Sequence, residues 1–513
     1  RKPEYELKIA TDRPQYIQGD RIQVTTQANY FFGGPVKDAE VRWSLLSDDY
    51  FFQYQGEGWY SFEDFKGWDY YRPYTYRYGE PLAQGKGKTD AEGRFTFSAP
   101  ADIAARGQSQ NFTFDVRVLD INGQEVAGAT TAVVHKAAFY LGTAPRQYVL
   151  KAGQPGQVDF ITVDPDSRPV ASIPLTAVVS LAKWYSVQEK SDDGRFYWAS
   201  KVEETPVVTQ TLTTDAQGKV VLMWTPDVGG QYIVRARAAD AQGNAVASAA
   251  FVWVSGQAEA FVPWRMESND RINLVADKKE YQVGDVAQVL VPSPYQGAVR
   301  ALLTLERGRI LSHAVITLTS NSETLAIPIT EEHAPNIFVS VVLVKGMDEQ
   351  APSPSFKVGY VELPVSIKEK ELQITLTPSA AVVAPRAPLT YTVEARVAAG
   401  NPVEADLSLA LIDKAVLSLA GPNTEGIVSR FYRRRGVGVN TAAMLAINLD
   451  RLVEQQAKGT KGGGGGPGGE GPSVRREFPD SAFWAPSVVT NAAGKAEVSL
   501  TLPDNLTTWR MIG

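Results

Sequence analysis

The chain contains no cysteine, and this absence excludes several kinds of protein. Without thiols there is no disulfide scaffold, no cysteine-ligated zinc and no thiol catalysis. A secreted location stays open, because domains above about 100 residues fold without disulfide bonds. Only three histidines occur among 513 residues, and none belongs to an HExxH or His-x-His pattern. A histidine-based catalytic or metal centre is therefore not indicated.

Long apolar runs and a strong charge imbalance are missing too. No stretch of about 18 apolar residues exists that could span a membrane. The net charge of −6, with 21% charged residues, argues against a nucleic-acid partner. The chain starts at Arg1 without a signal peptide or lipid-anchor motif and ends at Gly513 after a strand-like run. We expect a segment of a longer protein, so the missing targeting signals say nothing about its parent.

What is present repeats itself and is typical of an all-β fold. A strand–turn–strand pattern built around a tyrosine and a glycine recurs about every 130 residues. A degraded fourth copy follows, in which Val382 takes the place of the tyrosine. The glycine supplies a backbone conformation with positive φ. The four copies are residues 12–20, 144–154, 277–285 and 378–393.

A second repeat marks the other side of each unit. It reads Thr-Asp/Asn-Ala-x-Gly-Arg/Lys, and in it Asp or Asn folds back on its own backbone while Gly closes a hairpin. The distance from the first repeat to this glycine is about 70 to 77 residues in the first two units and about 112 in the last. The last unit therefore holds roughly 35–42 extra residues, which we interpret as an insertion within one sandwich. The copies begin at Thr89, Thr214 and Thr490.

These repeats predict tandem antiparallel β-sandwiches of the immunoglobulin-like or fibronectin-like type, with a flexible insertion in the last one. The expected modules are residues 1–137, 138–256, 257–366 and 367–513. The insertion, at about 429–482, contains Arg433-Arg434-Arg435 and a run of five glycines, Gly462 to Gly466. An exposed segment of this kind inside a compact domain is a protease target first and a structural element second.

Several motifs along the chain point to a known family. The most specific lead into and out of the insertion, at 410–419, 478–484 and 502–510. The others are Tyr30 to Val36, Tyr281 to Asp285, Ile329 to Ile337 and Val339 to Leu343. With these motifs the chain resembles, over essentially its whole length, the bacterial α2-macroglobulins, the protease-trapping relatives of complement proteins.

The resemblance implies macroglobulin domains three to six, with the family's bait region inserted in the sixth. It implies a fragment of a broad-spectrum endopeptidase inhibitor, in which cleavage of the bait triggers a conformational change that traps the protease. The implied partners are target endopeptidases, and the implied location is extracytoplasmic: periplasmic, cell-surface or secreted. The family's thioester needs a Cys-x-x-Gln pair, which this chain lacks. The absence of cysteine also favours a bacterial source over the disulfide-containing vertebrate inhibitors. Both a membrane-anchored and a free parent stay open.

The candidate cleavage residues of the insertion suit different proteases, since basic residues attract trypsin-like enzymes and large apolar residues attract chymotrypsin-, subtilisin- and elastase-like ones. A generic polar linker would carry few large apolar residues. The competing interpretations are a flexible tether and a short amphipathic helix at 441–456. The candidates are Arg430, Phe431, Arg433, Arg434, Arg435, Leu445, Leu449, Arg451, Leu452, Lys458, Lys461, Arg475 and Arg476.

Other functional interpretations are weaker. Glu331-Glu332-His333 would bind a metal poorly, because adjacent residues on a strand point to opposite faces. The glycine run lacks the Gly-Lys-Ser/Thr order of a phosphate loop. The aromatic stretch Tyr50–Tyr78 could be a binding platform or a hairpin packed on its own or a neighbouring domain; we favour packing. We predict no enzyme activity, no cofactor and no metal or small-molecule site. The alternative function is a bacterial surface adhesin or stalk of tandem sandwiches.

Overall fold

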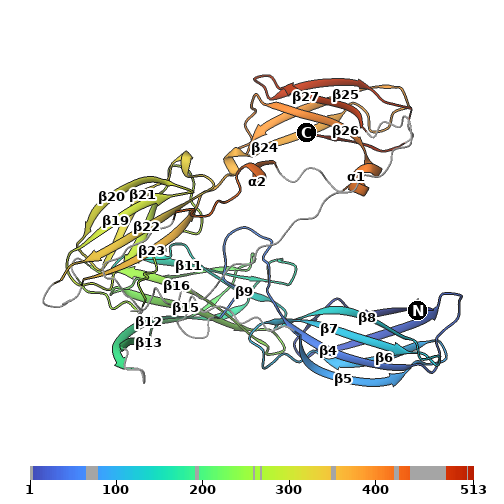
Figure 1. The fold of residues 1–513 in the computed structure, drawn as a ribbon, viewed down its shortest axis with the longest axis horizontal. Helices are drawn as coiled ribbons and strands as arrows, with labels where there is room; N and C mark the ends of the chain where they lie inside the picture. Colours follow the sequence, from blue (N-terminus) through green and yellow to red (C-terminus); the bar gives the residue numbers. More distant parts are fainter. Residues whose placement is uncertain are drawn as a thin grey trace, which may run out of the picture.

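The structure is a computed structural model, and it describes residues 4–64, 79–190, 196–257, 260–265, 269–347, 354–420, 427–439, 481–504 and 507–513. Within these ranges the regular elements are almost all β-strands, and they form four two-layered sandwiches in tandem (Figure 1). The prediction of an all-β fold is therefore confirmed. No helix in the described part combines the length and apolar character needed to cross a bilayer.

Domain 1 is a sandwich of a three-stranded and a five-stranded sheet. Phe112, Phe114, Ile22 and Val24 are fully buried between the two layers. Alternation of buried and exposed residues along the strands gives each sheet one apolar face. The sheets are β1(Tyr5–Thr11)-β3(Arg21–Tyr30)-β6(Arg94–Pro100) and β2(Gln15–Ile17)-β8(Glu125–His135)-β7(Ser109–Leu119)-β4(Glu40–Tyr50)-β5(Glu80–Lys88).

Domain 2 repeats this plan, and even the parallel pairing of the short second strand with the last strand recurs. Its core includes Phe160, Trp224 and Tyr232. Its sheets are β14(Lys219–Trp224)-β11(Gly156–Val163)-β9(Tyr140–Pro145) and β10(Val149–Lys151)-β16(Ala245–Ser255)-β15(Gly230–Ala239)-β12(Pro174–Lys190)-β13(Phe196–Thr213).

Domain 3 packs a three-stranded sheet on a four-stranded sheet around Tyr281, Val289, Val341 and Leu343. Domain 3 also contains two short 3-10 helices, η1(Glu331–His333) and η2(Lys368–Lys370), and η2 directly precedes the first strand of domain 4. The sheets are β17(Val275–Ala276)-β18(Val286–Pro292)-β21(Ser322–Pro328) and β20(Ile310–Leu318)-β19(Val299–Glu306)-β22(Asn336–Lys345)-β23(Ser355–Pro364).

Domain 4 is the smallest sandwich, with three strands in each described sheet. Its core contains Leu409, Leu411, Val393 and Leu500. The sheets are β24(Leu372–Pro378)-β25(Pro388–Val397)-β28(Lys495–Thr501) and β27(Ser481–Val489)-β26(Asp406–Asp413)-β29(Trp509–Ile512). Two helices, α1(Lys414–Ala420) and α2(Ile427–Phe431), follow β26, and Figure 1 shows α2 between domains 3 and 4.

The Thr-Asp/Asn-Ala-x-Gly repeat forms the same turn in domains 1, 2 and 4. In domain 1, Oδ1 of Asp90 accepts the backbone N–H groups of Glu92 (3.0 Å) and Arg94 (2.8 Å). Gly93 has a φ of +75°, and a Cβ there would meet the carbonyl oxygen of Ala28 at 2.5 Å. The equivalent groups of the other two turns make the same contacts. Glycine is therefore required for close backbone approach as well as for its conformation.

The threonine of this repeat has a role that the sequence did not reveal. Thr89 is buried, and its hydroxyl donates to the carbonyl of Val36 (2.7 Å) and accepts the N–H of Ala39 (2.9 Å). Thr490 joins Val403 and Ala405 in the same way in domain 4. The threonine thus connects the turn by hydrogen bonds to a segment that is distant in the sequence.

The tyrosine repeat places a buried hydroxyl in a fixed network. In domain 3 the hydroxyl of Tyr281 donates to Oδ1 of Asp277 (2.8 Å) and accepts the N–H of Lys278 (3.1 Å). Tyr16 makes the equivalent pair of bonds with Asp12 and Arg13 in domain 1. Each hydroxyl therefore links the strand before the turn to the core beneath it.

The fourth copy of this repeat is shifted by one residue from the prediction. Val382 is 90% exposed and does not occupy the buried position of the tyrosine. The bond from the N–H of Leu502 to the carbonyl of Ala387 corresponds to that from Ala101 to Asp20 in domain 1. Counting back four residues from Ala387 gives Val383, which packs against the core of domain 4. Without the tyrosine, the sequence alone could not fix this register.

The described half of the aromatic stretch packs against domain 2. Phe52 stacks on Tyr140 with ring centroids 4.0 Å apart, and Phe62 meets both rings edge-on. Ser61 and Thr143 exchange two backbone hydrogen bonds of 2.9 Å. For residues 50–64 the structure agrees with packing on a neighbouring domain, whereas residues 65–78 lie outside the described residues.

Candidate functional site

Domain 4 is interrupted between two strands that are hydrogen-bonded neighbours. β26 and β27 are antiparallel, and Ile412 pairs with Ser481 at the end of their ladder. About 67 residues (480 − 413) separate the strands, although two to five residues suffice to join such neighbours. We call residues 414–480 the insert.

The strands that flank the insert line a single core. Leu409 on β26 is fully buried, and Val498 and Leu500 on β28 pack in the same cluster. The strands on both sides of the insert thus belong to one sandwich. The two strands do not pair with each other, because β26 and β28 belong to opposite sheets and β26 pairs with β27 instead.

The start of the insert is fixed to domain 4. Oδ1 of Asp413 accepts the N–H of Ala415 (2.8 Å) and the hydroxyl of Thr507 (2.9 Å). The N–H of Lys414 donates to the carbonyl of Thr508 (2.9 Å). The insert thus starts at residue 414, and Ser429, the predicted first residue of the bait, lies within α2. The bounds 429–482 stay a prediction of where proteases cut.

After α2 the chain lies against domain 3. The side chain of Asn336 is fully buried and pairs with both backbone groups of Arg435. The N–H of Arg435 donates to Oδ1 (3.0 Å), and Nδ2 donates to the carbonyl of Arg435 (2.8 Å) and to Oε1 of Glu362 (3.0 Å). Two residues on, the N–H of Gly308 donates to the carbonyl of Val437 (2.9 Å). We call residues 434–438 the docked strip.

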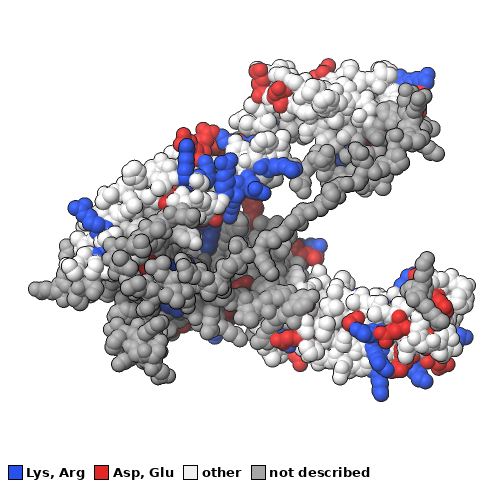
Figure 2. Space-filling view, in the orientation of Figure 1, with Lys and Arg blue, Asp and Glu red and all other residues white. Residues whose placement is uncertain are grey.

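The docked strip meets a positively charged part of domain 3. Nη1 of Arg307 donates to the carbonyls of Ala334 (2.5 Å) and Asn336 (3.4 Å). Burial, and then the nearby charge of Arg435, lower the pKa of the Arg307 guanidinium. Figure 2 shows Lys and Arg side chains gathered where domain 3 faces the insert. The hydrogen bonds of Asn336 and Gly308 therefore hold this strip beside a like charge.

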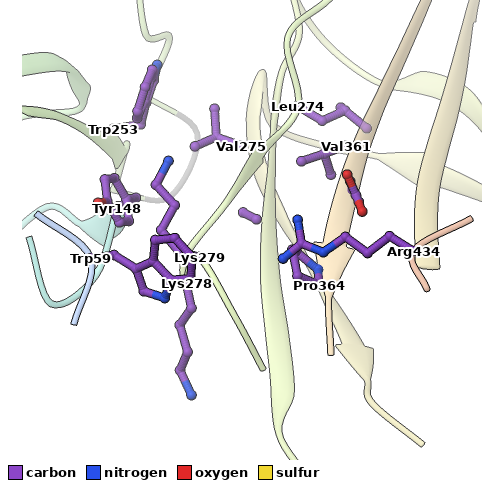
Figure 3. A pocket seen from close by; sticks show the side chains of 12 residues that line it. Trp59, Tyr148, Trp253, Leu274, Val275, Lys278, Lys279, Val361, Pro364 and Arg434 are labelled. Carbon is purple, nitrogen blue, oxygen red and sulfur yellow. The ribbon is translucent and has the colours of Figure 1, made fainter. Parts of the chain in front are cut away.

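Arg434 reaches into a pocket formed where three domains meet. The pocket has a volume of about 300 Å³ and is lined by Trp59 of domain 1, Tyr148 and Trp253 of domain 2, and residues of domain 3. Figure 3 shows the side chain of Arg434 extending toward the middle of this group. One face is occupied by Lys279, whose Nζ lies 4.5 Å from the ring centre of Tyr148. The insert thus touches domain 3 at a point where domains 1 and 2 are also within reach.

The predicted cleavage residues fall into two groups. Arg430 and Phe431 lie in α2, and Arg433, Arg434 and Arg435 follow it; all five side chains are exposed. Two of the five, Arg434 and Arg435, also belong to the docked strip, and cleavage at all five stays a prediction. The remaining candidates lie outside the described residues: Leu445, Leu449, Arg451, Leu452, Lys458, Lys461, Arg475 and Arg476.

Three family models match successive parts of the chain. A model of the alpha-2-macroglobulin bait region domain matches residues 272–419, and one of bacterial macroglobulin domain 6 matches residues 142–254. A third, of the alpha-2-macroglobulin family, matches residues 481–513, directly after the insert. The chain belongs to the α2-macroglobulin family.

Related α2-macroglobulins are similar to this chain along nearly all of its length. The alpha-2-macroglobulin homolog of Nostoc sp. is 23% identical over 99% of this chain and 27% of its own length. The alpha-2-macroglobulin of Ralstonia nicotianae is 26% identical over 99% of this chain and 30% of its own length. The chain therefore spans less than a third of these curated relatives.

A solved structure, the native conformation of E. coli alpha-2-macroglobulin, matches 99% of this chain and 32% of its own chain. The identity is 17% and the TM-score is 0.36. The family model that matches residues 142–254 is that of bacterial macroglobulin domain 6, whereas the sequence resemblance counts residues 138–256 as the family's fourth domain. The ordinals third to sixth stay predictions.

The α2-macroglobulin family comprises protease inhibitors that are not enzymes, which confirms at family level the prediction of a non-enzymatic chain. One of the histidines, His333, has a structural role. The buried His333 accepts the N–H of Thr330 at Nδ1 (3.1 Å) and closes the helix η1. Residues 331–333 were expected on a strand, and the strand argument against a metal site there was wrong. Among the described residues, no group of three His, Asp or Glu side chains is placed to hold a metal ion.

The residues that position the insert were missed by sequence reasoning. Asn336 and Arg435 are 99 residues apart in the chain, and neither has a local partner that would mark the contact. The only sequence signal is a polar asparagine directly before the apolar run Ile337–Leu343, where β22 enters the core. A buried side-chain amide needs partners, so this position predicts a hydrogen-bonded site without naming what binds there.

Proposed function

We propose that this chain is the bait-carrying part of a broad-spectrum endopeptidase inhibitor. A target protease cuts the insert between residues 429 and 482, and the cut triggers a conformational change by which the whole protein traps the protease. The chain itself supplies the bait and the scaffold, with no catalytic residue and no cofactor. The single observation that carries the proposal is the insert, which leaves domain 4 between paired strands and docks on domain 3.

This path supports a role in which cleavage is sensed. The insert starts at Asp413, is held at Arg435 on domain 3 and returns to domain 4 at Ser481. An intact backbone restricts how far domains 3 and 4 can move apart, and cutting it removes a restriction between parts that are otherwise separate sandwiches. Release of a constraint by proteolysis is an established kind of switch.

Relatives support the choice of partner. Two structures of E. coli alpha-2-macroglobulin are described as activated by trypsin and by porcine elastase, two proteases with different specificities. We propose that endopeptidases are likewise the partners of this protein and that it acts outside the cytoplasm, in the periplasm, on the cell surface or after secretion.

Limited proteolysis tests the proposal against the alternative of a surface adhesin or stalk. The chain is treated briefly with low ratios of trypsin, chymotrypsin and elastase, and the first fragments are identified by mass spectrometry. We expect all three proteases to cut first between residues 429 and 482, because the insert is the one long interruption of a sandwich among the described strands. Primary cuts near residues 137, 256 or 366, between the sandwiches, would favour a stalk instead.

A further inference from the structure

The three arginines 433–435 are equivalent in sequence but not in structure. Each is a trypsin-type residue with an exposed side chain. Arg435, however, has both backbone groups bonded to the buried side chain of Asn336. Arg434 lines the pocket between the domains. The peptide bonds after these arginines thus have different surroundings, although a trypsin-like protease would recognise the same side chain at each.

Cleavage needs the backbone groups that Asn336 occupies. A serine protease places the carbonyl oxygen of the residue before the cut in its oxyanion hole. The carbonyl of Arg435 already accepts Nδ2 of Asn336 at 2.8 Å, and the adjacent N–H donates to Oδ1 at 3.0 Å. A protease that cuts after Arg435 must first detach the strip from domain 3. Two bonds of this kind make that opening unfavourable.

The amide of Asn336 is fully committed, which fixes its orientation. Both hydrogens of Nδ2 are used, one on the carbonyl of Arg435 and one on Glu362, and Oδ1 accepts an N–H. Rotating the amide by 180° would point its oxygen at a carboxylate and a carbonyl, so the observed orientation is the one that satisfies every partner. With an exposed fraction of 0%, the side chain has no competing water.

We propose that Asn336 is a positioning residue that fixes the docked strip on domain 3 and thereby withholds the peptide bonds after Arg434 and Arg435 from proteases. The inference rests on the proposed function in that it treats the insert as the segment that proteases attack. The most basic part of the insert is then bound to domain 3. Trypsin-like enzymes therefore make their first cuts elsewhere in the insert.

Domain 3 offers a matched control. Asn321 is also buried and clamps a backbone residue in the same way: its Oδ1 accepts the N–H of Val262 (2.9 Å) and its Nδ2 donates to the carbonyl of Val262 (2.7 Å). Val262 belongs to the connection between domains 2 and 3, not to the insert. Asn321→Ala therefore removes the same kind of bonds from the same domain without touching the docked strip.

A second variant acts from the insert side and leaves the core of domain 3 unchanged. Gly438 has a φ of +61°, and a Cβ there would lie 2.8 Å from the Cα of Gly308. Gly438→Val thus displaces the strip by a steric clash and an unfavourable backbone conformation. It reports on docking even if Asn336→Ala weakens the fold of domain 3.

The experiment compares trypsin cleavage of the chain with that of a synthetic peptide of residues 427–439, which has the same bonds without docking. Mass spectrometry gives the initial rate at each arginine. In the parent chain we expect the bond after Arg435 to be cut at least about tenfold more slowly than in the peptide. In Asn336→Ala and Gly438→Val the two rates should become similar, whereas Asn321→Ala should behave as the parent. Melting curves of all variants verify that domain 3 stays folded.

Each other outcome overturns the proposal. Equal rates in the parent chain and the peptide would show that docking gives no protection. A change in Gly438→Val alone would remove the role of Asn336, and an equal change in Asn321→Ala would indicate general loosening. If trypsin first cuts the chain outside residues 429–482, the proposed function fails while the rate at Arg435 can still be measured. If the insert is cut first but Arg435 is unprotected, only the positioning role fails.

Discussion

Replacing the insert by a tight turn should stabilise domain 4. β26 and β27 are antiparallel neighbours, so a four-residue turn can join Asp413 to Ser481 without changing the register in which Ile412 pairs with Ser481. No residue of the domain 4 core is removed, since the core residues lie on the strands and their immediate connections. The change therefore acts mainly on the unfolded chain.

The size of the effect follows from loop length. Each doubling of a connection costs about 0.6 kcal/mol in closure entropy, and shortening about 67 residues to four is about four halvings. The expected gain is about 2.5 kcal/mol in the free energy of unfolding of domain 4. Without the insert this domain has roughly 80 residues, for which 1 kcal/mol moves the melting temperature by about 4–8 °C. We expect a rise of roughly 10–20 °C.

Calorimetry of three chains measures this: the parent, the short-turn variant, and a control in which residues 414–480 become a Gly/Ser chain of equal length. The control loses docking on domain 3 as the short variant does, so their difference isolates loop length. The transition of domain 4 should rise only in the short variant. If that variant melts at or below the control, the insert is not a passive connection and β26 and β27 need it for their pairing.

Three further changes have defined outcomes. Replacing residues 430–476 by a Gly/Ser chain of equal length in the full-length parent should abolish protease trapping, measured as residual protease activity on a large protein substrate, with little change in melting temperature; trapping that survives would place the bait elsewhere. Burial lowers the pKa of His135 to about 4, so the unfolded chain, with a pKa near 6.5, binds the proton first as the pH falls. Stability should therefore decline between about pH 6.5 and 4, by about 3 kcal/mol in total, and His135→Gln should lose this part of the pH dependence in urea titrations; an unchanged dependence would contradict it. Tyr281→Phe removes a buried hydroxyl bonded to Asp277 and Lys278 and should cost domain 3 about 1–3 kcal/mol, whereas Tyr360→Phe, on an exposed ring of the same domain, should change little; similar losses in both would refute the role of that network.

The sequence predicted the architecture because the repeats are local devices. A turn such as Asp90–Arg94 is held by the side chain of its own first residue, and its glycine is required wherever the turn recurs. Such motifs can be recognised by their fixed spacing, and the repeats and their spacing are the basis on which the sequence predicts tandem sandwiches and an insertion in the last one. Where the tyrosine is missing, the local signal weakens, and the predicted position was off by one residue, at Val382 instead of Val383.

The candidate site was predictable only in part, because its contacts are long-range. The basic and apolar composition of the insert could be read directly, whereas the contact of Asn336 with Arg435 depends on how domain 3 and the insert meet. Asn321 and Asn336 look alike in sequence, as single asparagines next to strands, yet one holds a connection between domains and the other holds the insert. No short-range pattern separates them. The helical state of His333 was missed for a similar reason, since its capping contact replaces the strand that its neighbours suggest.

The pairing of β26 with β27 has a consequence for the molecule after it has been cut. The piece on the C-terminal side of a cut in the insert carries β27, β28 and β29, which pair with β26 and β25 of the other piece and share their core. Cleavage of the insert therefore yields a split protein that is still assembled: two bands under denaturing conditions but one particle in native solution. At this point of the fold the backbone can be cut while the two pieces stay associated. A cut in the insert therefore leaves the C-terminal strands in place.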